Sequence, residues 1–174
     1  MQIFYECRQL ELATAGLIEI KQQRDTGQIN LKDFYSEKNK LEALIEKYKH
    51  AKMPTLHIHQ QYTLEALLAF TFYEMQVNSY SDCVISDLRL FTKNDVSVPQ
   101  ADTIYILDHY DNEGGNPEGY TQYVLDNNLE LAYNGELFVD VISSYQDYKI
   151  EFDVNLLIKA LEYYCENDNF MEIE

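Results

Sequence analysis

Two histidines in the first half of the chain are the closest approach to a metal-binding motif. His57 and His59 flank Ile58, so on a β-strand both imidazoles would point to one face and could begin a zinc site. A third ligand would have to come from elsewhere in the chain. The other interpretation is a strand that enters a domain with two polar side chains facing water, and the sequence favours it. A small metalloprotein or enzyme that uses His57 and His59 is kept as an alternative function.

The carboxylates, cysteines and glycines form no catalytic pattern. The acidic turn from Asp108 to Glu118 lacks the ligand spacing of a calcium loop, and nothing singles out two of its acids as general acid and base. Gly114-Gly115 lacks the lysine of a phosphate-binding loop. Cys83 has no histidine close to it in sequence that could activate its thiol. We therefore predict a protein that is not an enzyme and has no catalytic residue, metal or cofactor.

Tyrosines and acids alternate instead, in a pattern typical of a binding surface. Residues 105–148 contain seven tyrosines, which offer rigid apolar area, while acids attract Lys and Arg over a distance and form charge-assisted hydrogen bonds with them. Tyr105 shares a strand face with Leu107 and can belong to the core instead. The residues predicted to contact a partner are Asp108, Tyr110, Asp111, Glu113, Glu118, Tyr120 and Tyr123.

Charge is distributed unevenly along the 174 residues. Residues 1–52 hold nine Lys or Arg and eight Asp or Glu, whereas residues 53–174 hold four Lys or Arg and 22 Asp or Glu. The second part therefore carries nearly all of the net charge of −17. Such a field repels nucleic acid and anionic membranes and attracts basic proteins. Acidity can also serve solubility alone, but that need does not explain why one part of the chain is neutral.

The first part, 1–52, has the periodicity of two amphipathic helices. Apolar residues recur at steps of three and four on each side of Asp25-Thr26-Gly27, and Asn30 with Asp33 resembles a helix cap. Two such helices joined by a short turn are expected to form an antiparallel hairpin.

The second part, 53–174, mixes helical and strand patterns. Thr63 and Asp153 are predicted to cap helices, and a third helix is expected after Asn134-Gly135. Strands are predicted within 83–91, at 103–108 and 120–125, and as a short run within 127–133. The expected fold class is α+β: an N-terminal helical hairpin, followed by a domain with a small antiparallel sheet flanked by helices.

Bulk features point to the cytoplasm. The first seven residues lack a basic region followed by an apolar run, and no stretch approaches the roughly 18 apolar residues of a membrane span. The three cysteines, Cys7, Cys83 and Cys165, are scattered and odd in number, which suggests buried free thiols in a reducing compartment.

Residues 63 to about 173 resemble a bacterial domain family found among immunity proteins of contact-dependent growth inhibition and related polymorphic toxin systems. The resemblance is carried by TLEALL at Thr63, FVDVI at Phe138 and LLIKALEYYCENDNF at Leu156. It implies an immunity protein that binds and neutralises one cognate toxin, and the acidic surface suggests a basic nuclease domain as the target. We expect a monomer that forms a 1:1 complex. An acidic DNA mimic or regulatory adaptor is the other alternative.

Overall fold

The structure is a computed structural model that describes residues 2–76, 83–93, 98–111, 118–148 and 151–172, with the backbone alone for 2–5. The chain divides into two compact units, Met1–Pro54 and Thr55–Glu174. This division falls two residues after the boundary expected from the sequence.

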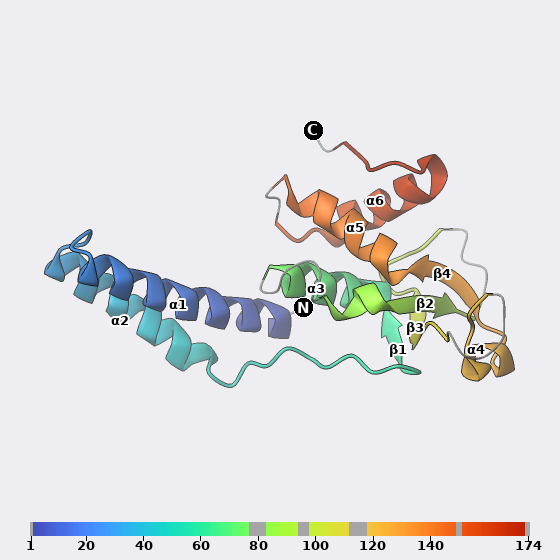
Figure 1. Cartoon of the computed structure of the whole chain (residues 1–174), viewed down its shortest axis with the longest axis horizontal. Coiled ribbons are helices and arrows are strands. Elements are labelled where there is room, and N and C mark those ends of the chain that lie inside the picture. Colours follow the sequence, from blue (N-terminus) through green and yellow to red (C-terminus); the bar gives the residue numbers. More distant parts are fainter. Residues whose placement is uncertain (1, 77–82, 94–97, 112–117, 149–150, 173–174) are drawn as a thin grey trace. The chain divides into compact units, whose positions relative to one another are not determined.

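The first unit is a helical hairpin. Helix α1 (Gln2–Asp25) runs antiparallel to α2 (Leu31–Tyr48), and the two pack along their length (Figure 1). The turn between them uses Gly27 at φ +73°, a conformation that glycine adopts without steric cost. Asn30 caps α2, because its side-chain oxygen accepts a hydrogen bond from the Asp33 backbone amide.

The second unit contains the sheet and the remaining helices. Its elements in chain order are β1 (Gln61–Thr63), α3 (Leu64–Met75), the 3-10 helix η2 (Val84–Asp87), β2 (Leu88–Thr92), β3 (Ile104–His109), α4 (Gln122–Asp126), β4 (Glu130–Asn134), α5 (Gly135–Gln146) and α6 (Val154–Asn167). Among the described residues, no helix is both long and apolar enough to cross a membrane.

The four strands form one antiparallel sheet in the order β1-β3-β2-β4. The long strand β3 pairs with β1 on one side and with β2 on the other, and Leu107 lies opposite Leu90. The predicted α+β class with a small antiparallel sheet flanked by helices is therefore confirmed.

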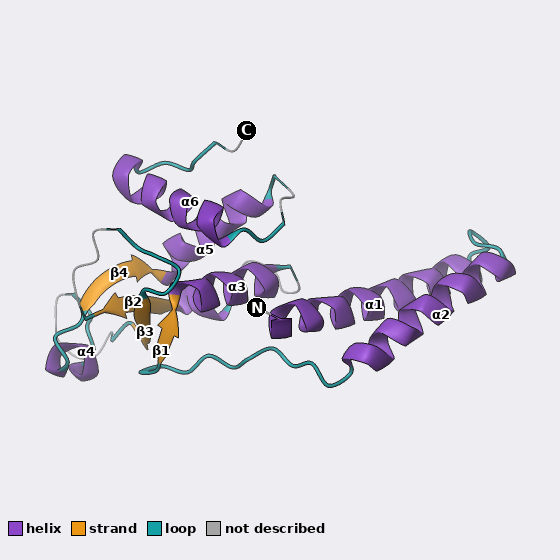
Figure 2. Cartoon of the chain, turned by 180° about the vertical axis from the view of Figure 1, so that it is seen from behind, coloured by secondary structure: helices purple, strands orange, loops and turns teal. Residues whose placement is uncertain are grey.

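One face of the sheet is covered by α3, α5 and α6, which also pack against one another (Figures 1 and 2). Tyr105 of β3 contacts Tyr133 of β4, and Tyr133 contacts Phe138 of α5. Since side chains alternate along a strand, Leu107 points the same way as Tyr105, and both are buried. The prediction that Tyr105 can belong to the core is confirmed.

The opposite face carries a smaller apolar cluster. Phe91 of β2 and Ile106 of β3 pack there with Val124 of α4 and Leu129, and two half-buried tyrosines, Tyr120 and Tyr123, lie against them. The short helix α4 and its flanks thus place two of the predicted contact residues, Tyr120 and Tyr123, against the sheet.

The strand predicted at 120–125 is wrong. Most of this run belongs to α4, because the Thr121 hydroxyl accepts a hydrogen bond from the Val124 amide and caps a helix. The run 83–91 holds a strand as predicted, but β2 begins only at Leu88, after η2. At the start of this run, the carboxylate of Glu74 accepts hydrogen bonds from the Cys83 thiol and the Val84 amide, and these bonds keep residues 83–84 out of the sheet.

The last helix, α6, buries Leu157, Ile158, Ala160 and Leu161, and Tyr164 is half-buried. The expectation of three buried cysteines holds for Cys7 and Cys83 but is wrong for Cys165, which is exposed near the end of this helix.

Candidate functional site

A buried carboxylate lies at the centre of the predicted site. Asp108, near the end of β3, has no exposed surface. Its Oδ2 accepts a hydrogen bond of 2.5 Å from the Thr121 hydroxyl and lies 3.2 Å from His59 Nε2. Its Oδ1 accepts a hydrogen bond of 2.8 Å from the His109 backbone amide. This network joins β3 to the start of α4 and to the segment before β1. Asp108 is therefore not available to a partner, and we remove it from the predicted contact set.

His59 is held in place from several sides. Its backbone adopts φ +63°, in the left-handed region, and its amide donates to the Leu107 carbonyl at 2.8 Å. Its ring stacks on Tyr123 with a centroid distance of 3.9 Å. The expectation that His57 and His59 lie on a strand is wrong, since β1 begins only at Gln61. Among the described residues, no three His, Cys, Asp or Glu side chains are grouped as metal ligands.

The Asp108, His59 and Thr121 side chains do not have the geometry of an activated nucleophile. In such a site the base contacts the nucleophile, and the carboxylate orients the base from its other side. Here the Thr121 hydroxyl and His59 both contact Asp108 Oδ2, and the Thr121 oxygen also accepts the Val124 amide. The network therefore fixes neighbouring segments relative to one another.

The ends of the acidic turn are organised around a cation. The Arg89 guanidinium donates to the Glu118 carbonyl at 2.8 Å and lies 4.3 Å from the ring centroid of Tyr110. Gly119 has φ +63°, and a Cβ there would meet the Tyr110 ring at 2.2 Å. The tyrosine, the arginine and the tight glycine turn thus fix the two ends of residues 110–119. Sequence spacing does not reveal this role of Arg89, because its hydrogen-bond partner Glu118 lies 29 positions away.

The other predicted contact residues lie around this turn with different exposures. Tyr110 and Glu118 are exposed, and Asp111 is half-buried. Tyr120 packs edge-on against Phe91 and Tyr123 stacks on His59, so each offers only part of its ring to a partner. Glu113 lies outside the described residues.

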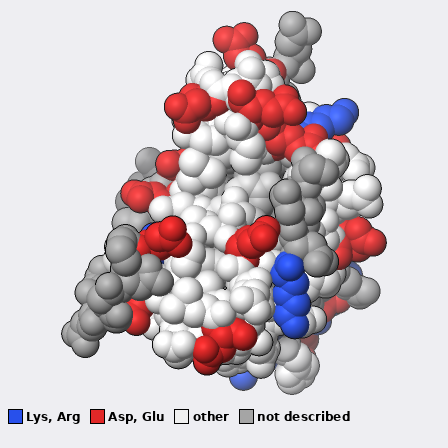
Figure 3. Space-filling model, turned by 90° about the vertical axis from the view of Figure 1, so that its right-hand side faces the viewer, with Lys and Arg blue, Asp and Glu red and all other residues white. Residues whose placement is uncertain are grey.

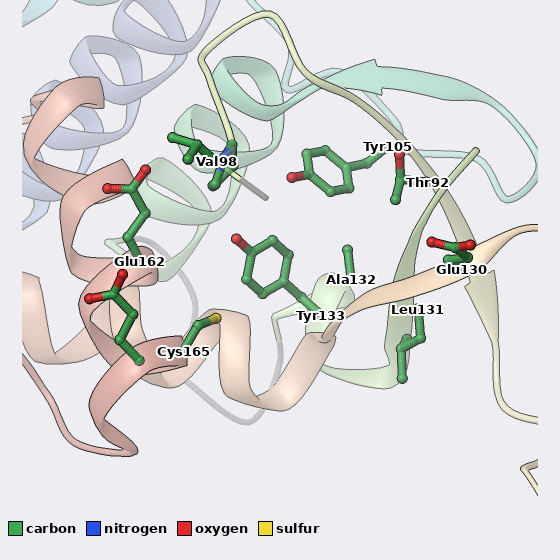
Figure 4. Close-up of a pocket in the computed structure, with 11 residues that line it drawn as sticks. Thr92, Val98, Tyr105, Glu130, Leu131, Ala132, Tyr133, Glu162 and Cys165 are labelled. Atoms are coloured by element: carbon green, nitrogen blue, oxygen red, sulfur yellow. The ribbon is translucent and has the colours of Figure 1, made fainter. Parts of the chain in front are cut away.

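A pocket of about 320 Å³ opens on the helical side of the sheet, between β3, β4 and α6. Figure 4 shows the Tyr105 and Tyr133 rings in its middle, with Glu162 and Cys165 from α6 on one side and Glu130 and Leu131 from β4 on the other. The remaining lining residues are Thr92, Val98, Pro99, Ala132 and Glu166. The pocket therefore combines apolar walls, two phenols, a thiol and three carboxylates.

The two phenols and the thiol in this pocket favour their neutral forms. Burial raises the pKa of Tyr105 to about 12, and burial followed by the neighbouring Tyr105, Cys165 and Glu162 raises the pKa of Tyr133. Desolvation and then the charge of Glu166 raise the pKa of the Cys165 thiol. This holds although the residue as a whole is exposed, because its sulfur is directed toward the tyrosines (Figure 4). The phenols thus stay uncharged at neutral pH and can both donate and accept hydrogen bonds.

Acidic side chains dominate one face of the molecule. Figure 3 shows Asp and Glu spread around a pale, hollowed surface on which Lys and Arg are few. Exposed acids of the second unit include Asp102, Glu118, Asp126, Glu130, Glu136, Asp147, Glu151, Glu166 and Asp168. Charge in this unit is therefore displayed at the surface, with Asp108 and Glu74 as the two buried acids among the described residues.

Comparisons with known proteins locate the chain in one family. No curated protein and no solved structure matches it. A family model described as "Domain of unknown function (DUF7716)" matches residues 77–173. This range begins after α3 and covers the sheet strands β2 to β4, the pocket and the helices α4 to α6. Because the match spans more than half of the 174 residues, the chain belongs to the DUF7716 family.

Proposed function

We propose that this chain is an immunity protein, which binds one cognate bacterial toxin and blocks its activity, and that the target is a basic nuclease domain. The observation that carries the proposal is the display of charge. In residues 53–174, 22 acids stand against four Lys or Arg, and one of those four, Arg89, is engaged by Tyr110 and the Glu118 carbonyl.

The first unit differs in this respect. Four of the eight acids in residues 1–52 form ion pairs with neighbouring cations, in Arg24–Asp25, Lys38–Glu42, Lys40–Glu37 and Lys49–Glu46. A charge that is balanced locally exerts little long-range force, whereas an unbalanced acidic surface accelerates encounter with a basic partner. The second unit is thus the better candidate for the toxin-binding part.

The basic partner follows from chemistry. A nuclease must attract phosphate and therefore presents Lys and Arg around its active site. Acids for attraction, together with half-exposed tyrosines such as Tyr110 for contact area, complement such a face. A protein of this kind needs no catalytic group of its own.

The test begins with the neighbouring genes: the proposal expects one of them to encode a toxin domain, which is then produced on its own. Cells that produce the toxin domain are expected to survive only when the chain is co-expressed, and the purified pair is expected to elute as a 1:1 complex. Association measured by stopped flow should slow as salt rises, because exposed charges act mainly on the association rate. Failure to protect, or preferential binding to a host DNA-binding protein, would contradict the immunity proposal, and the latter would favour a DNA mimic.

A charge-matched pair of variants tests the contact surface. Asp111→Asn combined with Glu118→Gln should slow toxin association several-fold at low salt and flatten its salt dependence. Glu19→Gln combined with Glu37→Gln, in the helical hairpin, removes the same charge and should leave the rate unchanged. Equal effects of the two pairs would show that only net charge matters and would remove the residue 110–119 turn from the interface.

A further inference from the structure

The pocket between β3, β4 and α6 contains buried polar groups aimed into open space. Tyr105 and Tyr133 are 1% and 6% exposed, yet both hydroxyls line the pocket. They are hydrogen-bonded to each other. One such bond uses one of their two protons and one lone pair, so the pair keeps acceptor capacity that can be directed toward a ligand. Because both rings are buried while both hydroxyls face the pocket, the pair places hydrogen-bonding groups where a ligand can reach them.

The surroundings of the two hydroxyls define the ligand. Three carboxylates, Glu130, Glu162 and Glu166, line the pocket, and none of its described lining residues is Lys or Arg. Val98, Pro99 and Leu131 supply apolar wall, which suits the methylene stem of a long side chain. The aromatic rings favour a cation over a neutral group. The ligand should therefore be a cation that donates several hydrogen bonds at the end of an apolar stem.

Size restricts the choice further. A volume of about 320 Å³ is at the lower end of the range for ligand pockets, so it suits one side chain better than a folded segment. Arginine has five donors in a planar group and pairs well with carboxylates and aromatic rings.

We infer that this pocket receives an arginine side chain of the basic partner, held by the Tyr105–Tyr133 pair and by the carboxylates of Glu162 and Glu166. The identity of the donor protein rests on the proposed function, whereas the preference of the pocket for a guanidinium does not. The inserted side chain fixes the position of a partner that the acidic surface attracts from a distance.

The test uses the full chain and N-acetylarginine amide as probe. The chain is labelled with carbon-13 in its tyrosine rings, and the Tyr105 and Tyr133 signals are assigned from Tyr105→Phe and Tyr133→Phe spectra. Titration with the probe should shift both signals saturably. N-acetylcitrulline amide, the neutral isostere, should shift them at least fivefold more weakly at equal concentration, because loss of the charge removes the attraction to the carboxylates.

Charge variants separate the pocket from the overall field. Glu162→Gln combined with Glu166→Gln should weaken probe binding about fivefold, the effect of two partly exposed ion pairs. Asp147→Asn combined with Glu151→Gln removes the same charge before the start of α6, whereas Glu162 and Glu166 lie about 12 and 18 Å along the helix from its first residue, Val154. This control pair should change binding less than twofold. Unchanged tyrosine spectra establish that the variants fold.

Several results would overturn the inference. They are the absence of saturable shifts, equal shifts with the citrulline derivative, and equal weakening by the two variant pairs. Spermidine is a further probe, and binding tenfold tighter than that of the arginine derivative would assign the pocket to a small polyamine. No toxin is present in this assay. A negative probe titration would therefore contradict the arginine pocket and not toxin neutralisation, whereas a failure to neutralise the toxin would contradict the proposed function and not the probe result.

Discussion

Replacement of Asp108 by alanine is expected to lower the free energy of unfolding of the second unit by about 3 kcal/mol. The carboxylate is completely buried and accepts hydrogen bonds from the Thr121 hydroxyl and the His109 amide. Loss of the acceptor leaves both donors without a partner, and a buried donor without a partner costs about 1–3 kcal/mol. Both hydrogen bonds are only partly buried. We therefore take a cost of about 1.5 kcal/mol for each donor, from the lower part of that range.

Two further substitutions define which atoms are responsible. Asp108→Asn keeps one acceptor oxygen and is expected to cost about half as much. Thr121→Val removes the hydroxyl that bonds Asp108 and also caps α4. If the bond between the two side chains is as described, the double variant Asp108→Asn with Thr121→Val should be less destabilised than the sum of the single changes, by about 1 kcal/mol. Asp102→Asn, which removes an exposed acid just before β3, serves as the charge-matched control and should lie within about 0.5 kcal/mol of wild type.

The assay is guanidinium unfolding followed by the Tyr123 ring resonances. Tyr123 stacks on His59, which itself contacts Asp108, so this signal reports the second unit and is independent of the helical hairpin. If Asp108→Ala unfolds at the same denaturant concentration as Asp102→Asn, the buried carboxylate does not support the fold, and the assignment of the network as structural is refuted.

Two further predictions concern the contact between η2 and the helices. Burial is the main cause that raises the pKa of Glu74 above its ordinary value of 4.5. Between 4.5 and the folded pKa, the folded state binds more protons than the unfolded state. The free energy of unfolding therefore falls as pH rises through this window. Glu74→Gln can still accept the Cys83 and Val84 hydrogen bonds on one oxygen and should flatten this part of the stability profile measured by urea unfolding from pH 4 to 8; an unaltered slope would contradict the assignment. At Gly135, a Cβ would lie 1.9 Å from the Ile85 carbonyl oxygen and 2.3 Å from that of Leu88. The backbone at Ile85 and Leu88 must move to admit a side chain, so Gly135→Ala should lower the free energy of unfolding by about 3 kcal/mol and the melting temperature by about 10 °C. An unchanged melting curve would show that η2 can shift without cost.

The parts of the fold that could be predicted are those specified by neighbouring residues. Thr63, Asn134 and Asp153 each accept a hydrogen bond from an amide two or three residues ahead, and in each case the sequence shows a capping residue followed by apolar residues at helical spacing. The alternation in Thr103–Asp108 likewise predicted strand β3 and the inward position of Tyr105. Local hydrogen bonds and apolar periodicity decide these elements.

The errors arise where the local signal is short or where distant residues decide. In residues 120–125 the β-forming tyrosines and valine outweighed the capping signal of Thr121, since a helix of five residues shows little periodicity. The link between His59 and Asp108 joins residues 49 positions apart, and no spacing rule reveals it. The pocket is hidden for the same reason, because Tyr105 and Tyr133 are brought together only by the strand order, in which β2 lies between β3 and β4.

The acidity and the proposed function are connected through stability. Three carboxylates, Glu130, Glu162 and Glu166, line the pocket, and none of its described lining residues is Lys or Arg. Unbalanced charge of this kind disfavours the compact state through self-repulsion. A basic partner relieves that repulsion when it binds, so the same carboxylates that weaken the isolated fold strengthen the complex. A surface selected only for solubility would not require these charges to surround a pocket with two buried phenols, whereas a surface that receives an arginine would.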